Sequence, residues 1–197
     1  MFAIRIDSIA VLTGAVAALT FAGCSMMGPP STGDNVFSLT SSAFADGTML
    51  QKKNAGNNPK NPNCIGENVS PPLSWSNPPA GTRSYALFMV DPEGRQGLGV
   101  NHWVAYGIPV AVTGFAENEV SQLTDRYVGG KSTQGLGHYF GPCTPPATGM
   151  HHYTFTLIAT DLDPKELPPG LTREEVVTKL QGHTKGAAGL VGLFGRP

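Results

Sequence analysis

The sequence predicts a mainly β, loop-rich fold whose strands pack in layers, as in a β-sandwich. Charged residues make up only 14% of the 197 residues, whereas glycine (25) and proline (17) are abundant, a balance atypical of helical bundles. The segment 85–90 (YALFMV) is a short apolar run between turn signals, which is typical of a strand buried on both faces. The segment 151–160 places alternate residues on two faces, as a strand does.

The first 23 residues are predicted to lie outside this fold as a signal peptide. Arg5 is followed by an uncharged apolar run over 9–23, which is short for a membrane-spanning helix of about 20 residues. The run ends in the residues FAGC at 21–24, which are similar to a bacterial lipobox except that Phe21 stands where leucine is usual. We therefore expect export of the chain and lipidation of Cys24.

Lipidation would make the protein a lipoprotein, held at the outer face of the cell membrane by lipid such as palmitate on Cys24. Secretion after cleavage and retention of the segment as an uncleaved anchor are the alternatives. Residues 24–35 are rich in glycine, proline and polar residues, which predicts a flexible tether before one domain over 36–197. The net charge of −1 and the lack of a basic run in the sequence argue against nucleic acid as a partner.

Cys64 and Cys143 are the cysteines that remain within the predicted domain. In an exported protein such a pair suggests a disulfide, and a bridge across so large a loop would stabilise the fold by roughly 4 kcal/mol in the chain-entropy model. The alternative is two buried free thiols. A structural metal site fits poorly, because no Cys-x-x-Cys or paired-histidine spacing accompanies them in the sequence.

The first half of the domain predicts short strands separated by loops rich in proline and asparagine. In chain order, the expected elements are a strand (36–39), an irregular loop (51–68), an extended segment forced by proline (70–75), the buried strand (85–90), a further strand (102–109) and a glycine-rich excursion (114–140). Asp91 follows the buried strand directly, so we expect it at the edge of the core and not in open solvent.

The second half begins with a rigid loop over 141–149, whose prolines cannot donate backbone hydrogen bonds and which leads into the strand at 151–160. Thr172 and Glu175 have the spacing of a capping box, which predicts a helix that Gly182 ends. Its expected apolar face consists of Leu171, Val176, Val177 and Leu180. A second short helix is expected over 184–190, and a last strand or tail over 191–194.

Polar side chains stand at the strand ends beside these loops, namely Asp91, His102, His151 and Tyr153. Singly, each has an ordinary interpretation, such as a turn aspartate or a core histidine with satisfied hydrogen bonds. Together they favour a site. His151 and His152 point to opposite faces of a strand, and we expect His151 in the site because Tyr153 continues its face.

Two kinds of site fit these residues. In the first, the imidazoles donate N–H bonds to an anion, while Asp91 orients one histidine or receives an ammonium group of the ligand. In the second, Asp91, His102 and His151 bind a metal as a facial triad, as in a cupin-like enzyme. The sequence contains no nucleophile elbow, P-loop or dinucleotide-binding motif that would favour another chemistry.

Several segments, taken in order, resemble the phosphatidylethanolamine-binding protein family and its bacterial Raf kinase inhibitor-like branch. The similar segments are GENVSPPLSW at 66–75, Ser84 to Pro92, His102-Trp103, the stretch from Gly141-Pro142-Cys143 to His151-His152-Tyr153, and the tail from His183 to Arg196. The resemblance covers nearly the whole predicted domain. Thr144 departs from it, since bacterial members usually have Cys-Pro-Pro without an intervening residue.

The resemblance implies an antiparallel Greek-key β-sandwich with short peripheral and C-terminal helices. It also implies a small pocket for an anion such as phosphate or a phospholipid headgroup, with the ligand-binding residues Asp91, His102, Pro142, Pro145, His151 and Tyr153. We therefore expect a binding protein or regulator without catalysis, cofactor or metal. Some members inhibit kinases or serine proteases, so a protease inhibitor is a further alternative.

Overall fold

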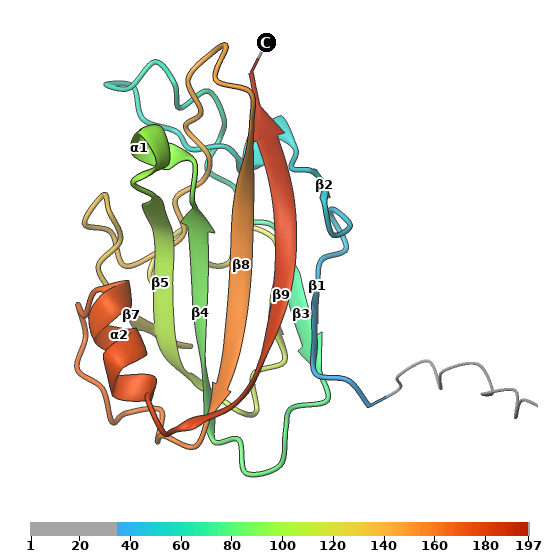
Figure 1. The fold of residues 1–197 in the computed structure, drawn as a ribbon, viewed down its shortest axis with the longest axis vertical. Coiled ribbons are helices and arrows are strands. Elements are labelled where there is room, and N and C mark those ends of the chain that lie inside the picture. The colour runs from blue at the N-terminus through green and yellow to red at the C-terminus, as the bar shows by residue number, and fades with distance from the viewer. Residues whose placement is uncertain (1–34, 197) are drawn as a thin grey trace, which may run out of the picture. The chain divides into compact units, whose positions relative to one another are not determined.

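The computed structural model describes residues 35–196, which form two β-sheets and few helical turns. The larger sheet has the strand order β2-β9-β8-β4-β5-β7, and the smaller sheet has the order β1-β3-β6 (Figure 1). The strands are β1 (Ser38–Thr40), β2 (Thr48–Met49), β3 (Leu73–Ser76), β4 (Ser84–Asp91), β5 (Val100–Pro109), β6 (Gly114–Phe115), β7 (Val128–Gly129), β8 (Met150–Thr160) and β9 (Thr184–Gly195). The helical elements are η1 (Lys52–Asn54), α1 (Gly94–Gly97) and α2 (Arg173–Leu180).

The mainly β sandwich predicted from the sequence is confirmed. Within the larger sheet, β4, β5, β7 and β8 lie in the order 8-4-5-7, which is the strand order of a Greek key. Their pairs are antiparallel. An exception to the antiparallel expectation is the short β2, which pairs with β9 in parallel. The signal peptide, the lipidated Cys24 and most of the tether were predicted in segments that lie outside the described residues.

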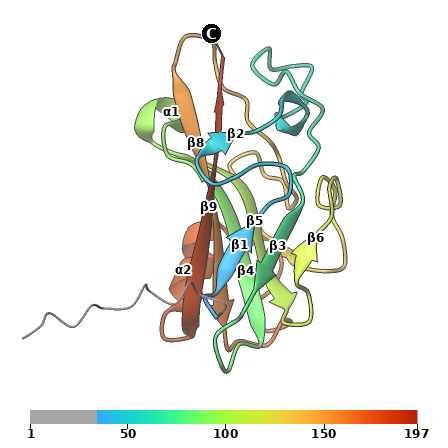
Figure 2. The same ribbon diagram turned by 90° about the vertical axis from the view of Figure 1, so that its right-hand side faces the viewer.

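The larger sheet is covered on both faces, by the smaller sheet on one side and by α2 on the other (Figure 2). Between the sheets, Trp75 meets Phe115 and Tyr85 edge to face, with ring centroids 5.4 Å and 5.7 Å apart. Side chains of this size contribute about 1.5–3 kcal/mol each when they are fully buried. On the other face, Val176 and Leu180 of α2 pack with Phe88 and neighbouring apolar residues.

Helix α2 begins as the sequence predicts. The Thr172 Oγ1 accepts a hydrogen bond from the Glu175 backbone N–H at 3.2 Å, and the Glu175 carboxylate accepts one from the Thr172 N–H at 2.8 Å. The helix ends before Gly182, whose φ of +82° is costly for other residues. Val177 departs from the expected apolar face, since its side chain is exposed.

The prediction of a second helix over 184–190 is wrong, because this segment is the first half of β9. The whole of β9 pairs with β8, from Thr184 opposite Thr160 to Gly195 opposite Met150. The buried residues Ala188, Leu190 and Phe194 follow the two-residue period of a strand. This non-local pairing overrides a weak helical pattern that glycines already disfavour. A smaller difference is that the first strand covers 38–40 and not 36–39.

No helix among residues 35–196 is long and apolar enough to cross a membrane.

The strand register brings the predicted polar residues to one end of the larger sheet. Because β4 is antiparallel to both of its neighbours, its last residue, Asp91, lies beside the first residues of β5 and β8. Asp91 pairs with Val100, two residues before His102, and β8 begins with Met150 and His151. The loop after β4 and the loop before β8 therefore meet at this end (Figure 1).

Two segments that are distant in sequence are packed backbone to backbone beside this end. A Cβ built on Gly141 would lie 1.9 Å from the carbonyl oxygen of Asn54, so only glycine fits this approach. The Tyr139 hydroxyl donates to the same carbonyl at 2.7 Å. The Gly56 N–H donates to the Pro142 carbonyl at 2.8 Å. These contacts hold the loop before β8 in place.

We expect Gly141→Ala to destabilise the domain by about 3 kcal/mol or more, because the methyl group would collide with backbone that cannot move aside. The matched control is Gly189→Ala in β9, where the nearest atom to the added Cβ is 3.9 Å away. Denaturant unfolding followed by fluorescence measures both changes. Equal free energies of unfolding for the two variants would show that the approach at Gly141 is not tight.

Candidate functional site

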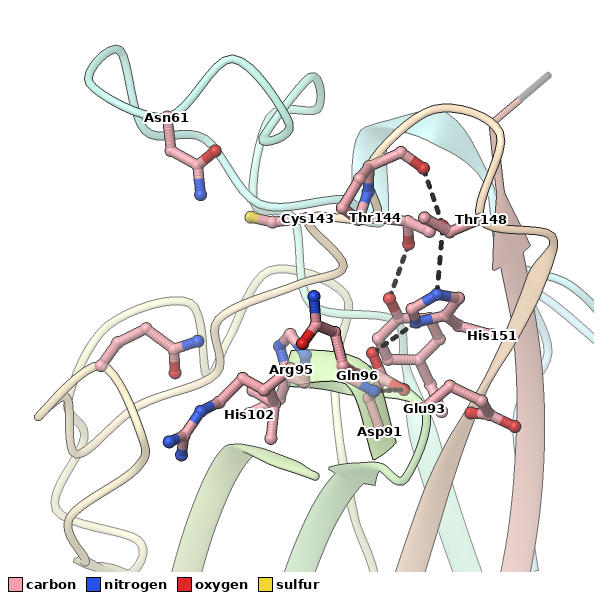
Figure 3. Close-up of a pocket in the computed structure, with 15 residues that line it drawn as sticks. Asn61, Asp91, Glu93, Arg95, Gln96, His102, Cys143, Thr144, Thr148 and His151 are labelled. Carbon is pink, nitrogen blue, oxygen red and sulfur yellow. Dashed lines mark hydrogen bonds and ion pairs between the residues drawn. The ribbon is translucent and has the colours of Figure 1, made fainter. Parts of the chain in front are cut away.

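A cleft of about 630 Å³ opens at the end of the larger sheet where β4 stops and β8 begins (Figure 3). Its walls come from the loop after β4, the start of β5, the loop before β8, and the loop that carries Asn61. The lining residues are Asn61, Asp91, Glu93, Gly94, Arg95, Gln96, Val100, His102, Gln134, Cys143, Thr144, Pro145, Thr148, His151 and Tyr153. The structure therefore brings Asp91, His102, Pro145, His151 and Tyr153 together.

Asp91 is 3% exposed and its carboxylate is held from two sides. Its Oδ1 accepts a hydrogen bond from the Gly94 backbone N–H at 2.9 Å, which closes the turn after β4. Its Oδ2 accepts one from the His151 ring at Nδ1, at 2.8 Å. Because Nδ1–H must donate to a carboxylate, Asp91 fixes both the orientation of His151 and the nitrogen that carries hydrogen.

His151 continues this arrangement toward the rim of the cleft. Its Nε2 lies 3.2 Å from Oγ1 of Thr148, and the Thr148 hydroxyl is also 2.9 Å from the Pro145 carbonyl (Figure 3). The Thr148 hydroxyl has one hydrogen, which it can donate to the Pro145 carbonyl or to Nε2 of His151, because the ring hydrogen of His151 lies on Nδ1. Both ring nitrogens of His151 thus have partners within the protein.

His102 is held differently. Its Nδ1–H donates to the Phe140 carbonyl at 2.8 Å, and the side chain lies almost fully within the protein. Burial lowers the pKa of His102, against smaller opposing effects of the Phe140 carbonyl and the Asp91 charge. A neutral ring with hydrogen on Nδ1 carries a lone pair on Nε2. His102 therefore offers an acceptor, where the sequence led us to expect a donor to an anion.

Tyr153 forms the floor between the two histidines. Its ring meets His102 edge to face, with centroids 5.2 Å apart, and stacks near His151 at 6.5 Å. Its hydroxyl lies 2.7 Å from Oγ1 of Thr144. Burial raises the pKa of Tyr153 far above its usual range, so the phenol keeps its hydrogen.

Thr144 is a further candidate for a functional residue. The sequence indicates it only as a departure from the Cys-Pro-Pro pattern of the family. It is 1% exposed and shares a hydrogen bond with Tyr153. Two hydroxyls in such a pair own two hydrogens, of which one lies between them. The other is available to an acceptor outside the pair.

Of the two predicted prolines, Pro145 lines the cleft and Pro142 does not. Pro142 is buried and acts through its carbonyl, which accepts a hydrogen bond from Gly56. Its role is to position the loop before β8, which borders the cleft. No sequence signal distinguishes the two prolines, because the difference depends on which way each residue of the loop faces.

The turn after β4 supplies lining residues that the sequence did not indicate. Arg95 and Gln96 have φ values of 53° and 61°, in the left-handed region. Non-glycine residues there cost about 1 kcal/mol each, and such strain is common at functional sites. Within the lining set, Arg95 carries the guanidinium, and Asp91 and Glu93 carry the carboxylates.

His152 lies on the opposite face of β8 from His151, in the alternation that the sequence predicts. Its Nδ1 is 2.8 Å from a Glu93 carboxylate oxygen, and its backbone N–H donates to the other oxygen at 3.1 Å. Partial burial raises the pKa of Glu93, but these hydrogen bonds from His152 outweigh it and the net pKa is lowered. Glu93 is therefore ionised beside the cleft.

The metal-binding alternative predicted a triad of Asp91, His102 and His151. The group that the structure gathers instead is Asp91, Glu93 and His151, whose ligand atoms lie within 4.8 Å of one another. His102 is not part of it. Asp91 and His151 already bond to each other, and Glu93 bonds to His152, so a metal ion would have to displace these pairs.

Cys64 and Cys143 form a disulfide with their Cα atoms 4.3 Å apart. It links the loop that carries Asn61 to the loop that carries Thr144 and Pro145. The bridge spans 79 residues of sequence, which is worth about 4 kcal/mol in the chain-entropy model. The disulfide therefore holds together these two loops, each of which forms part of the wall of the cleft.

The model of the family described as phosphatidylethanolamine-binding protein matches residues 40–195. The chain belongs to this family. Within it, the chain is similar to a "UPF0098 protein" of Methanothermobacter thermautotrophicus, with 40% identity over 72% of the chain and 92% of that protein. It is also similar to the Mycobacterium tuberculosis protein named "Putative lipoprotein LppC", with 36% identity over 84% of the chain and 75% of that protein.

Solved structures of this family have the same fold. The structure of Escherichia coli YbcL, a member of the PEBP family, matches with a TM-score of 0.73 and 26% identity. The match covers 82% of this chain and 99% of YbcL. The PEBP homologue CT736 of Chlamydia trachomatis matches with a TM-score of 0.70 and 30% identity, over 83% and 99% of the two chains.

We expect the stability of the domain to fall as the pH drops below about 6.5, the usual histidine value, in part because of His102. The folded state lowers the pKa of His102, so only the unfolded chain binds this proton until the lower folded pKa is reached. The loss is at most about 1.4 kcal/mol per pH unit from this residue. Unfolding measured between pH 7.5 and pH 5 should show a smaller loss for His102→Gln.

The matched control for this experiment is His183→Gln, which changes an exposed histidine that pairs with Asp161. It should leave most of the acid sensitivity in place. An identical pH dependence for wild type and His102→Gln would mean that His102 is not held neutral in the folded protein.

Proposed function

We propose that this domain binds a small ligand that carries a phosphate group, free or as a phospholipid headgroup such as phosphoethanolamine. The observation that carries the proposal is that Asp91, His102, His151 and Tyr153, all buried, converge on one open cleft of about 630 Å³. Buried polar groups that face a cleft and not the core are typical of a ligand site. Membership of the family supports the same conclusion.

The charges of the cleft limit what this ligand can be. The lining includes the carboxylates of Asp91 and Glu93 and one guanidinium, that of Arg95, and burial lowers the pKa of His102. The lining is therefore not strongly cationic. A ligand fits best if it partly balances its own negative charge, through an ammonium group or through a hydrogen on its phosphate.

We propose that the site binds without catalysis. The row Asp91, His151, Thr148 has the order of an acid, a base and a hydroxyl nucleophile, which favours a hydrolase as the second candidate. However, the Thr148 hydroxyl has the Pro145 carbonyl as a closer partner, at 2.9 Å against 3.2 Å to His151. Hydrolysis of an aryl ester that Thr148→Val abolishes would overturn the proposal of a non-catalytic site.

The other two alternatives have separate signatures. A metal-dependent enzyme would contain stoichiometric metal when the unchelated protein is subjected to elemental analysis. A serine protease inhibitor acting through its surface would keep its inhibition when the cleft is altered. We do not propose a metal-dependent enzyme, because the groups that could bind a metal are paired with other side chains of the protein.

We expect phosphoethanolamine, and inorganic phosphate more weakly, to shift the ring signals of His102 and His151 in NMR titrations of the purified domain. His102→Gln should weaken binding about tenfold, which corresponds to one hydrogen bond of about 1.4 kcal/mol. His183→Gln is the matched control, since His183 pairs with Asp161 away from the cleft and should leave the affinity unchanged. Ligand-dependent shifts at His183 alone would place the ligand elsewhere.

We also propose that the protein is exported and anchored by lipid on Cys24. The similarity of residues 21–24 to a lipobox supports this, as does the lipoprotein name of a relative 36% identical. Cys24→Ser should move the protein from the detergent phase to the aqueous phase in a phase-partition assay of expressing bacteria. Cys64→Ser, which removes a disulfide partner and not the acylation site, is the control. Equal partitioning of wild type and Cys24→Ser would exclude this anchor.

A further inference from the structure

The turn after β4 holds two residues with a strained backbone inside a glycine-rich segment. Residues 94–99 read GRQGLG, and Gly97 and Gly99 have φ values of 89° and 81°, in the left-handed region that suits glycine. Arg95 and Gln96 are left-handed as well, with φ values of 53° and 61°, although each carries a long side chain. Glycine would adopt these two conformations without the steric cost.

The hydrogen bonds that hold this turn do not involve the side chains of Arg95 and Gln96. The Gly99 backbone N–H, for example, donates to the Gly94 carbonyl at 2.9 Å. Both side chains are exposed, and among residues 35–196 no hydrogen bond or ion pair engages either of them. No polar interaction in the described part of the chain therefore offsets the strain of placing an arginine and a glutamine here.

Both side chains stand at the mouth of the cleft. Arg95 and Gln96 belong to its lining, and they extend from the turn in different directions (Figure 3). The Arg95 guanidinium is not paired with the carboxylates of Asp91 and Glu93, which line the same cleft, so its charge is available to a ligand. Backbone strain that the surrounding contacts do not repay is typical of residues held in place for binding.

We propose that Arg95 and Gln96 determine specificity by binding a carboxylate of the ligand at the mouth, outside the buried groups of the cleft. The planar guanidinium of Arg95 matches the two oxygens of a carboxylate, and the Gln96 carboxamide adds N–H donors. The ligand class is therefore a small molecule or headgroup in which a carboxylate accompanies the group held in the cleft, as in serine and not in ethanolamine. The inference rests on the proposed function, to which it adds a second subsite.

Side chains held for binding at the expense of the fold should affect stability and affinity in opposite directions. Arg95→Gly and Gln96→Gly should each raise the ratio of folded to unfolded protein about twofold in denaturant unfolding, because relief of strain exceeds the extra freedom of glycine in the unfolded chain. The matched control is Asn118→Gly, at a left-handed residue that does not line the cleft, and it should leave the affinity unchanged. Loss of stability in both turn variants would show a structural role and overturn the proposal.

Phosphoserine and phosphoethanolamine form a matched pair of probes, since they differ by one carboxylate. The carboxylates of Asp91 and Glu93 disfavour an added negative charge on the ligand, so tighter binding of phosphoserine requires a cationic partner. By isothermal titration calorimetry at pH 7.5, we expect phosphoserine to bind about fivefold more tightly. Arg95→Gly should abolish this preference, and Arg95→Lys, which keeps the charge without the planar fork, should retain part of it. Equal affinities in the wild-type protein, or an undiminished preference in Arg95→Gly, overturn the proposal.

The diesters glycerophosphoserine and glycerophosphoethanolamine distinguish a lipid headgroup from a free monoester. A preference for the serine compound between the diesters supports a carboxylate subsite that accepts headgroups, and a preference between the monoesters alone supports one for a free small molecule. Binding of the four compounds without any preference refutes the carboxylate subsite and leaves the proposed function standing. Failure of all four to bind refutes the proposed function, and the subsite with it.

Discussion

The hydrogen bond between Asp91 and His151 is the interaction on which the site depends. It joins the last residue of β4 to the second residue of β8, at 2.8 Å and with both side chains nearly buried. Breaking it would leave the buried carboxylate of Asp91 without one of its donors, at a cost of several kcal/mol. The bond also fixes the hydrogen of His151 on Nδ1. The other ring nitrogen of His151 then lies next to Thr148. The Asp91–His151 contact therefore determines how Asp91, His151 and Thr148 follow one another from the end of β4 to the loop before β8.

The remainder of the fold serves to keep these two strand ends together. The antiparallel register of β4 with β5 and β8 places Asp91, His102 and His151 at one edge. The close approach of Gly141 to Asn54 and the disulfide between Cys64 and Cys143 hold the covering loops. The cleft is therefore built into a rigid frame, which suits selective binding of a small ligand more than enclosure by a moving lid.

Local patterns in the sequence predicted much of this, and non-local contacts account for the rest. The apolar run of β4, the alternation of β8 and the capping box at Thr172 depend on neighbouring residues, so they could be recognised. The strand β9 could not, because its glycine-rich first half is determined by pairing with β8. The residues Asp91, His102, His151 and Tyr153 could be gathered from their places at strand ends. Whether His102 donates or accepts could not be predicted, since it depends on the Phe140 carbonyl, 38 residues away.

A crystal structure of the domain with phosphoethanolamine would test the central claim most directly, because that claim concerns which atoms touch the ligand. Our account predicts that the phosphate group lies within the cleft, next to the ring of His102. The Asp91–His151 and His102–Phe140 hydrogen bonds should be unchanged. A phosphate group outside the cleft, or a metal ion bound by Asp91, Glu93 and His151, would contradict the account.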